Sequence, residues 1–221
     1  MSYPKALIFD LLTALLDSWS VWDTSIPAEK HIASGYTWRR RYLDLTYGCG
    51  AYVDYETLVE RSAVDTGLST SAAKSLIENW DNIKPWQEVP QVLRKLKKQG
   101  CKLAVVTNCS NELGMRAIKN CEAAVTHEMG APFRFDAVVT AEESGYYKPN
   151  PKPYLDVLKK MNVDAKDAIF VAGSAADIPG ASGVGMKVVW NNHAGLERKN
   201  DVKPWREGVN LGDALGDILQ L

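Results

Sequence analysis

The stretch Ala6-Leu7-Ile8-Phe9-Asp10 decides the fold, because it is an apolar run that ends on a single carboxylate. Its length and apolarity are typical of a short buried strand over Ala6 to Phe9. The residues that follow contain neither a glycine-rich phosphate loop nor a pair of metal ligands. Ligands of open α/β sheets bind outside the carboxyl ends of the strands, so Asp10 is a candidate nucleophile. A turn or helix-cap aspartate is the alternative that this segment alone leaves open.

Composition and charge narrow the class of protein. The chain has 221 residues, enough for one large domain or for a core domain with an inserted cap. Its 26 Lys and Arg against 27 Asp and Glu give a net charge of -1, which predicts neither a nucleic-acid partner nor a membrane partner. The four cysteines form no CxxC pair, the start of the chain lacks a signal-peptide layout, and no long apolar run occurs. We therefore expect a soluble, reduced, cytoplasmic protein.

Residues 17 to 88 differ from the rest of the chain, because they are rich in Trp and Tyr and contain no convincing strand. Trp38, Tyr42 and Leu45 recur at the spacing of one helix face. This pattern predicts an inserted helical segment.

From Val89 onward, predicted strands alternate with predicted helices. The sequence predicts helices over 91–99 and 153–161, a stiff proline-rich loop over 148–153, and strands over 102–106, 137–139, 168–171 and 187–190. This alternation indicates an α/β fold with a parallel, doubly wound sheet.

Polar residues follow several of these strands. The carboxyl ends of parallel strands lie at one edge of a sheet, so Asp10, Thr107, Asn108, Lys148 and Asp177 are expected to lie close together. Taken singly, Lys148 is also typical of a solvated loop and Asp177 of a helix cap. Their joint placement favours a site that contains a nucleophile, hydrogen-bond donors, a cation and a second carboxylate.

In their order along the chain, these segments resemble the haloacid dehalogenase-like hydrolases. The matching segments are Phe9-Asp10, Thr107-Asn108, Phe135-Asp136 through Ala141-Glu142-Glu143-Ser144-Gly145, Lys148-Pro149-Asn150-Pro151, and Asp177. The resemblance implies a Rossmann-like core over residues 1–16 and 89–221 and a helical cap over residues 17–88.

Within this superfamily the chain looks most similar to the 2-haloacid dehalogenases that invert L-substrates. Trp38-Arg39 followed by Tyr42-Leu43-Asp44-Leu45 resembles their cap motif around a substrate-binding arginine. Lys148 with Tyr154, and the segment Trp190-Asn191-Asn192-His193-Ala194-Gly195, also resemble that branch.

Two missing features separate this chain from the phosphatases of the superfamily. Those enzymes carry a second Asp two residues after the nucleophile, because an alkoxide leaving group must be protonated, and here that position is Leu12. They also hold magnesium with an acidic pair, of which Ala172-Gly173-Ser174-Ala175-Ala176-Asp177 retains one member. A halide leaves without a proton, so the omissions favour carbon–halogen cleavage without a metal or other cofactor.

The resemblance implies a mechanism and a set of site residues. Asp10 attacks C2 of a short (S)-2-haloalkanoic acid, and water hydrolyses the resulting ester to the (R)-2-hydroxy acid. Lys148 keeps Asp10 ionised, Asp177 holds Lys148 and helps to activate water, and Arg39 receives the halide. The expected substrate-binding residues are Arg39, Thr107, Asn108, Leu12, Trp38, Tyr42, Tyr154 and Ser174, although packing within the cap is the alternative for the aromatic members.

Several residues depart from the dehalogenase pattern. Leu12 and Ala14 replace Tyr and Thr, with Thr13 as a candidate substitute, and Ala172 and Ser174 replace Ser and Asn. These departures leave three alternatives open: a metal-free hydrolase that opens a C–N bond of another 2-substituted acid, a magnesium-dependent phosphatase, and a non-catalytic binding protein. The expected partner is a small carboxylate substrate, and a homodimer is an expectation from the resemblance.

Overall fold

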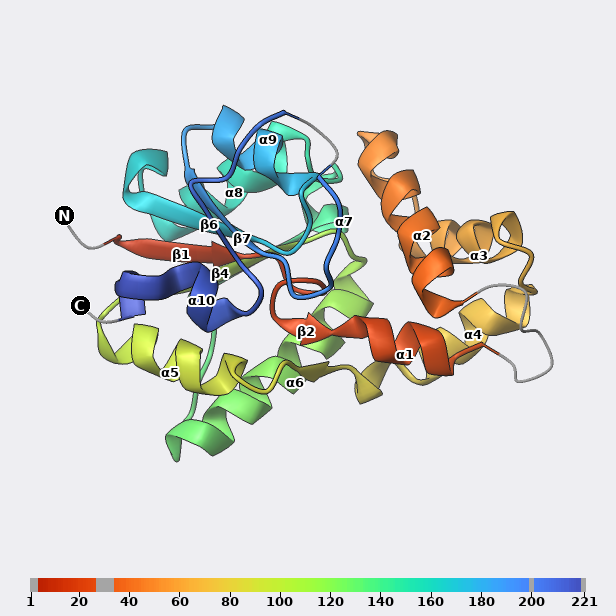
Figure 1. Cartoon of the computed structure of the whole chain (residues 1–221), viewed down its shortest axis with the longest axis horizontal. Coiled ribbons are helices and arrows are strands. Elements are labelled where there is room, and N and C mark those ends of the chain that lie inside the picture. The colour runs from red at the N-terminus through yellow and green to blue at the C-terminus, as the bar shows by residue number, and fades with distance from the viewer. Residues whose placement is uncertain (1–3, 27–33, 199–200, 220–221) are drawn as a thin grey trace.

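The fold is built on a six-stranded parallel sheet, seen in a computed structural model that describes residues 4–26, 34–198 and 201–219 (Figure 1). The strand order is β5-β4-β1-β6-β7-β8, and every neighbouring pair is parallel. The strands are β1 (Ala6–Phe9), β4 (Lys102–Thr107), β5 (Ala137–Thr140), β6 (Ala168–Ala172), β7 (Lys187–Asn191) and β8 (Arg206–Gly208). The predicted α/β fold class is confirmed, and β8 is a strand that the sequence pattern did not reveal.

Helices cover both faces of this sheet (Figure 1). The core helices are α5 (Val89–Lys98), α6 (Asn111–Met129), α7 (Ala141–Ser144), α8 (Pro151–Met161), α9 (Asp177–Gly183) and α10 (Leu211–Leu215). Side chains alternate across β1, so that Leu7 and Phe9 pack with α5, α6 and α10, whereas Ala6 and Ile8 pack with α8 and α9. Strands buried on both faces explain the continuous apolar run of β1.

A second group of helices lies to one side of the sheet, at the right of Figure 1. These cap helices are α1 (Ser18–Thr24), α2 (Gly35–Cys49), α3 (Tyr55–Asp65) and α4 (Thr70–Glu78), followed by a 3-10 turn at Trp80–Asn82. Where they join the core, β2 (Leu16–Asp17) pairs antiparallel with β3 (Lys84–Pro85). The expectation that residues 17–88 hold no strand is therefore wrong for these two short strands.

The proline-rich loop predicted over 148–153 is shorter than expected, because α8 already begins at Pro151. Proline is well tolerated in the first turn of a helix, where its missing N–H leaves no hydrogen bond unmade. Within the described residues, no helix combines the length and apolarity needed to cross a bilayer.

Candidate active site

The end of β1 places Asp10 in a buried turn. Its backbone N–H continues the sheet by donating to the Val171 carbonyl at 3.0 Å. Its Oδ2 accepts three hydrogen bonds, from the Thr13 N–H at 2.9 Å, the Thr13 hydroxyl at 2.6 Å and the Ala14 N–H at 3.2 Å. The carboxylate is thus fixed by its own turn, and Thr13 supplies the hydroxyl that Ala14 lacks.

Gly173, just after β6, allows this turn to pack closely. A Cβ at position 173 would lie 2.2 Å from the Thr13 hydroxyl oxygen and 2.4 Å from the Ala14 nitrogen. Any larger residue would push the turn away from β6 and disturb the hydrogen bonds to Asp10.

Lys148 lies between two buried carboxylates. Its Nζ donates to Asp10 Oδ1 at 2.6 Å and to Asp177 Oδ2 at 3.2 Å, and its side chain is fully buried. The Tyr154 hydroxyl donates to Asp177 Oδ1 at 3.2 Å. The position between the carboxylates, where a metal ion would be expected in a two-carboxylate site, is occupied by the lysine ammonium.

Asn108 fixes Lys148 from the neighbouring strand end. The Lys148 N–H donates to Asn108 Oδ1 at 2.7 Å, and Asn108 Nδ2 donates to the Lys148 carbonyl at 3.1 Å. Asn108 therefore positions the lysine. The nearby Thr107 hydroxyl is buried and has no hydrogen-bond partner within the described part of the chain, so it is the freer group for a ligand.

The charged groups of Asp10, Lys148 and Asp177 shift one another's pKa values. Burial alone would raise the pKa of Asp10, but the Lys148 ammonium and the hydrogen bonds from Lys148 and Thr13 together lower it. Burial opposes the charge on Lys148 as well, yet Asp10 and Asp177 raise its pKa. Burial and the nearby Asp10 charge raise the pKa of Asp177 to about 6, against the stabilising charge of Lys148. The result is an ionised Asp10 beside a carboxyl group that can accept a proton near neutrality.

Arg39 brings a positive charge to the site from α2. It is buried, and among the residues that the structure describes its Nε and Nη1 have no hydrogen-bond partner. Its guanidinium lies 5.5 Å from the Trp19 ring, 4.9 Å from the Trp22 ring and 5.4 Å from the Tyr42 ring. An unpaired cation within aromatic walls is suited to receive an anion.

Arg39 and Asp10 line the same small cavity. The full lining is Asp10, Leu12, Thr13, Arg39, Tyr42, Leu43, Tyr47, Thr107 and Asn108. Its volume of about 10 Å³ is room for about one water molecule. The Tyr42 hydroxyl, which donates to the Asn108 carbonyl at 2.9 Å, closes the cap helices over the core. A substrate therefore requires the cap helices to move.

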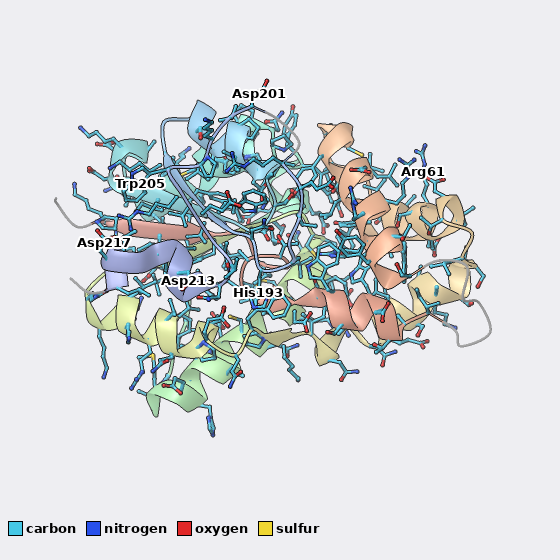
Figure 2. All side chains as sticks on the ribbon, in the orientation of Figure 1. Arg61, His193, Asp201, Trp205, Asp213 and Asp217 are labelled. Carbon is cyan, nitrogen blue, oxygen red and sulfur yellow. The ribbon has the colours of Figure 1, made fainter. Side chains whose placement is uncertain are left out.

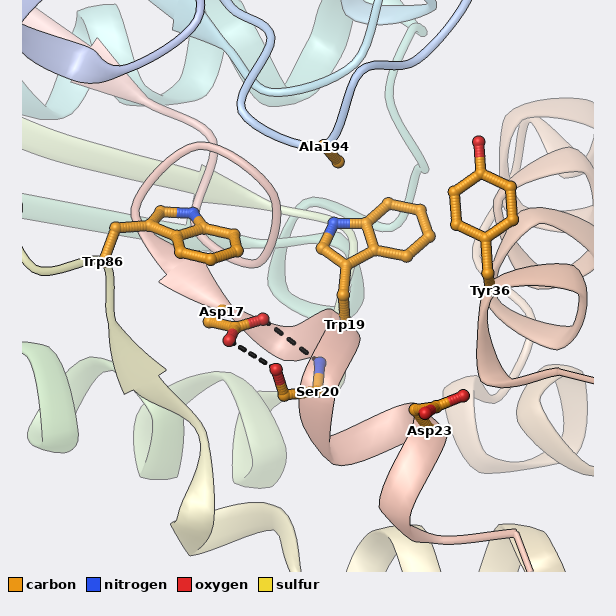
Figure 3. A pocket seen from close by; sticks show the side chains of 7 residues that line it. All are labelled: Asp17, Trp19, Ser20, Asp23, Tyr36, Trp86 and Ala194. Carbon is orange, nitrogen blue, oxygen red and sulfur yellow. Dashed lines mark hydrogen bonds between the residues drawn. The ribbon is translucent and has the colours of Figure 1, made fainter.

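A larger pocket of about 430 Å³ lies outside this cavity, between α1, α2 and the loop after β7 (Figure 3). It is lined by Asp17, Trp19, Ser20, Asp23, Tyr36, Trp86 and Ala194. Trp19 lines this pocket and also faces Arg39, which lines the buried cavity. His193, labelled in Figure 2, stacks on Trp86 with ring centroids 3.7 Å apart.

The structure brings most of the residues that the sequence singled out to this one place. Asp10, Lys148, Asp177 and Tyr154 form one hydrogen-bonded chain, and Leu12, Arg39, Tyr42, Thr107 and Asn108 line the cavity or its wall. Ser174 lines an adjoining cavity.

Trp38 lies elsewhere, because its indole N–H donates to Ser62 at 2.9 Å within the cap helices and the residue is absent from the cavity lining. For this residue, packing is what the structure supports.

Three residues of the cavity were not among the predicted site residues: Thr13, Leu43 and Tyr47. Thr13 could have been selected as the first hydroxyl after Asp10. Leu43 and Tyr47 follow the predicted Arg39 at i+4 and i+8 on α2, so the spacing of one helix face could have selected them.

Comparison with known proteins identifies the family. The family model of the haloacid dehalogenase-like hydrolases matches residues 4–185. The chain therefore belongs to the haloacid dehalogenase-like hydrolases, as the sequence motifs predicted, and it is a hydrolase of that family.

Individual relatives narrow the similarity further. An (S)-2-haloacid dehalogenase of Pseudomonas sp. (strain YL) is 29% identical over 93% of this chain and 90% of that enzyme. Haloacetate dehalogenase H-2 of Moraxella sp. (strain B) is 27% identical over 87% of each chain. The structure of the L-2-haloacid dehalogenase from Xanthobacter autotrophicus with chloropropionic acid covalently bound shares the fold, with a TM-score of 0.77, 20% identity, and coverage of 98% of this chain and 97% of that one.

Proposed function

We propose that this protein hydrolyses a short (S)-2-haloalkanoic acid to the (R)-2-hydroxy acid through an ester on Asp10. The observation that carries the proposal is the placement of an ionised, lysine-paired Asp10 and an unpaired Arg39 in the wall of one buried cavity. The dehalogenases among the relatives support it.

In the first step, a carboxylate oxygen of Asp10 forms a bond to C2 of the substrate as the C–halogen bond breaks. The halide departs with the bonding electrons and takes no proton, so no acid is needed. Arg39 is suited to meet the halide, since its guanidinium is buried and has two nitrogens without a partner. The free Thr107 hydroxyl is suited to the substrate carboxylate.

In the second step, water attacks the Asp10 carbonyl carbon and the ester bond breaks. Asp177 accepts the proton of the attacking water, a role for which its burial, which raises its pKa, is suited. Lys148, which is hydrogen-bonded to Asp10 Oδ1 and Asp177 Oδ2 in the free protein, offsets the negative charge that develops on the carbonyl oxygen of the esterified Asp10.

The size of the cavity supports a short substrate. The closed site has room for about one water molecule, so a small acid fits with less movement of the cap helices than a long one. Leu12, which is buried in the cavity wall, offers no proton to an alkoxide leaving group, which disfavours a phosphatase. The four free cysteines are in line with the cytoplasmic setting that we propose.

The test uses (S)-2-chloropropionate without added metal. We expect chloride release together with a mass increase on the peptide that contains Asp10. The Asp10→Asn variant, which keeps the shape of the side chain, is the control and should give neither signal. Absence of chloride and of adduct across several haloacids would contradict the proposal. Hydrolysis of 4-nitrophenyl phosphate that requires magnesium would instead support a phosphatase, and adduct formation with a strained cyclic imino acid would support C–N cleavage.

A further inference from the structure

Two water-sized cavities meet at Leu43 on α2. The inner one is the cavity that Asp10 lines. The outer one, of about 20 Å³, is lined by Arg40, Leu43, Ser174, Leu196 and Glu197. Leu43 contributes to both walls, so the outer cavity places space for a water molecule beside the catalytic cavity and apart from the pocket around Trp19.

Tyr47 lies one helical turn beyond Leu43 on α2 and lines the inner cavity with Asp10. Its hydroxyl lies near Ser174, Asp177 and Asp10, all three of which influence its protonation. Tyr47 and Ser174 thus place one hydroxyl in each of the two adjoining cavities, near the carboxyl group that accepts a proton in the hydrolytic step.

We propose that Tyr47 and Ser174 position the hydrolytic water against the ester on Asp10. This inference rests on the proposed function, and it concerns the second step alone. It also explains how the ester is hydrolysed although alanines occupy positions 14 and 172.

The chemistry balances without a further reactant. The water oxygen forms a bond to Cγ of the esterified Asp10, one of its protons passes to the Asp177 carboxylate, and the π electrons of the C=O bond move to the carbonyl oxygen. The tetrahedral centre then collapses, the bond from Cγ to the alkoxy oxygen breaks, and the alkoxide takes the proton from Asp177. Asp10 is left as a carboxylic acid and releases the second proton of the water to solvent, which restores its carboxylate. The hydroxyls of Tyr47 and Ser174 hold the water in place and are unchanged at the end.

Tyr47 acts here as a neutral hydroxyl. Burial, reinforced by the charges of Asp177 and Asp10, raises the pKa of Tyr47 well above its ordinary value. A phenol that stays protonated can donate one hydrogen bond and accept another, which suits a positioning residue and excludes a role as general base.

The experiment is a single-turnover comparison of Tyr47→Phe with wild type and with Tyr36→Phe. Tyr36 is the matched control because it lies on the same helix and is 41% exposed. It lines the larger pocket around Trp19 instead of the inner cavity that Asp10 lines (Figure 3). Chloride release reports alkylation, formation of the 2-hydroxy acid reports hydrolysis, and mass spectrometry gives the fraction of esterified Asp10. The probe is (S)-2-chloropropionate.

We expect Tyr47→Phe to leave the first-turnover chloride release unchanged and to slow ester hydrolysis by about tenfold, as expected when one buried hydrogen bond is lost. The esterified fraction at steady state should rise. Ser174→Ala should produce the same pattern, and Tyr36→Phe should match wild type.

Hydrolysis by Tyr47→Phe at the wild-type rate would overturn the inference. An equal slowing of alkylation and hydrolysis would overturn it too, because that result indicates that Tyr47 only packs the cap helices. If wild type itself releases no chloride and forms no adduct, the proposed function fails, and the inference fails with it.

Discussion

The buried arrangement of Lys148 between Asp10 and Asp177 makes a quantitative prediction about stability. Lys148→Met removes the cation and leaves two buried carboxyl groups facing each other. Removing one partner of a buried ion pair costs about 3–5 kcal/mol, because the remaining charge has no compensation. Part of this cost is offset when one carboxyl group takes up a proton. Since domains are stable by roughly 5–15 kcal/mol, the variant should remain folded and measurable.

Asp177→Asn should behave differently, because the Lys148–Asp10 pair stays intact. The pKa of Asp177 rises from 3.8 to about 6 on folding, so the folded protein at neutral pH carries about 3 kcal/mol of unfavourable ionisation energy that Asn does not have. We expect that removing this unfavourable energy offsets much of the stability lost with the hydrogen bonds from Lys148 and Tyr154 to Asp177. The folded state holds the Asp177 proton more tightly than the unfolded state, so wild type should lose stability as pH rises from about 4 to about 6. Asp177→Asn should lack that loss.

Urea denaturation followed by tryptophan fluorescence measures both variants and the double variant at pH 5 and pH 7. An equal slope of the free energy of unfolding against urea concentration shows that each variant exposes the same amount of surface on unfolding. The double variant should recover part of the loss of Lys148→Met, since the like charge facing Asp10 is gone. Equal stability of wild type and Lys148→Met, or a loss in Asp177→Asn as large as in Lys148→Met, would refute this account of the charges.

Three further predictions concern the chemical steps. Thr13→Val removes the shortest hydrogen bond to Asp10 Oδ2 and should slow first-turnover chloride release by about tenfold, whereas Thr13→Ser should keep the wild-type rate. Equal rates of chloride release in Thr13→Val and Thr13→Ser would refute the role of the hydroxyl. Arg39→Met should abolish inhibition by added chloride, with the surface variant Arg41→Met as control, and retained inhibition would show that the halide binds elsewhere. The rate of ester hydrolysis should decrease as the pH is lowered, with a midpoint at or below about 6, because esterification removes the Asp10 charge and so lowers the pKa of Asp177. A rate that stays constant down to pH 4 would contradict the role of Asp177 as the base.

The sequence predicted the parts of the site that the sheet itself assembles. Asp10 and Asn108 follow parallel strands, and the carboxyl ends of such strands meet at one edge. The same argument selected Lys148 and Asp177, the motif order along the chain supported the choice, and the structure places both in one hydrogen-bonded group with Asp10.

The remaining features depend on how segments that are distant in the sequence pack together. Thr13 reaches Asp10 only because the turn folds back against Gly173. Tyr47 reaches Ser174 only because α2 docks over the loop after β6. The short strand β8 has the sequence Arg-Glu-Gly and is only partly buried, so it carries no apolar pattern to reveal it. Trp38 was predicted as a substrate-binding residue from a motif position, but its side chain bonds to Ser62.

The central claim, that Asp10 is a nucleophile and forms an ester, is tested most directly by isotope labelling. A single turnover of (S)-2-chloropropionate, with enzyme in excess, is run in water enriched in ¹⁸O. Because water attacks the Asp10 carbonyl carbon, we predict that the label appears in the Asp10 carboxylate and that the 2-hydroxypropionate product is unlabelled. Label in the product and none in Asp10 would show that water displaces the halide directly, and it would contradict the account.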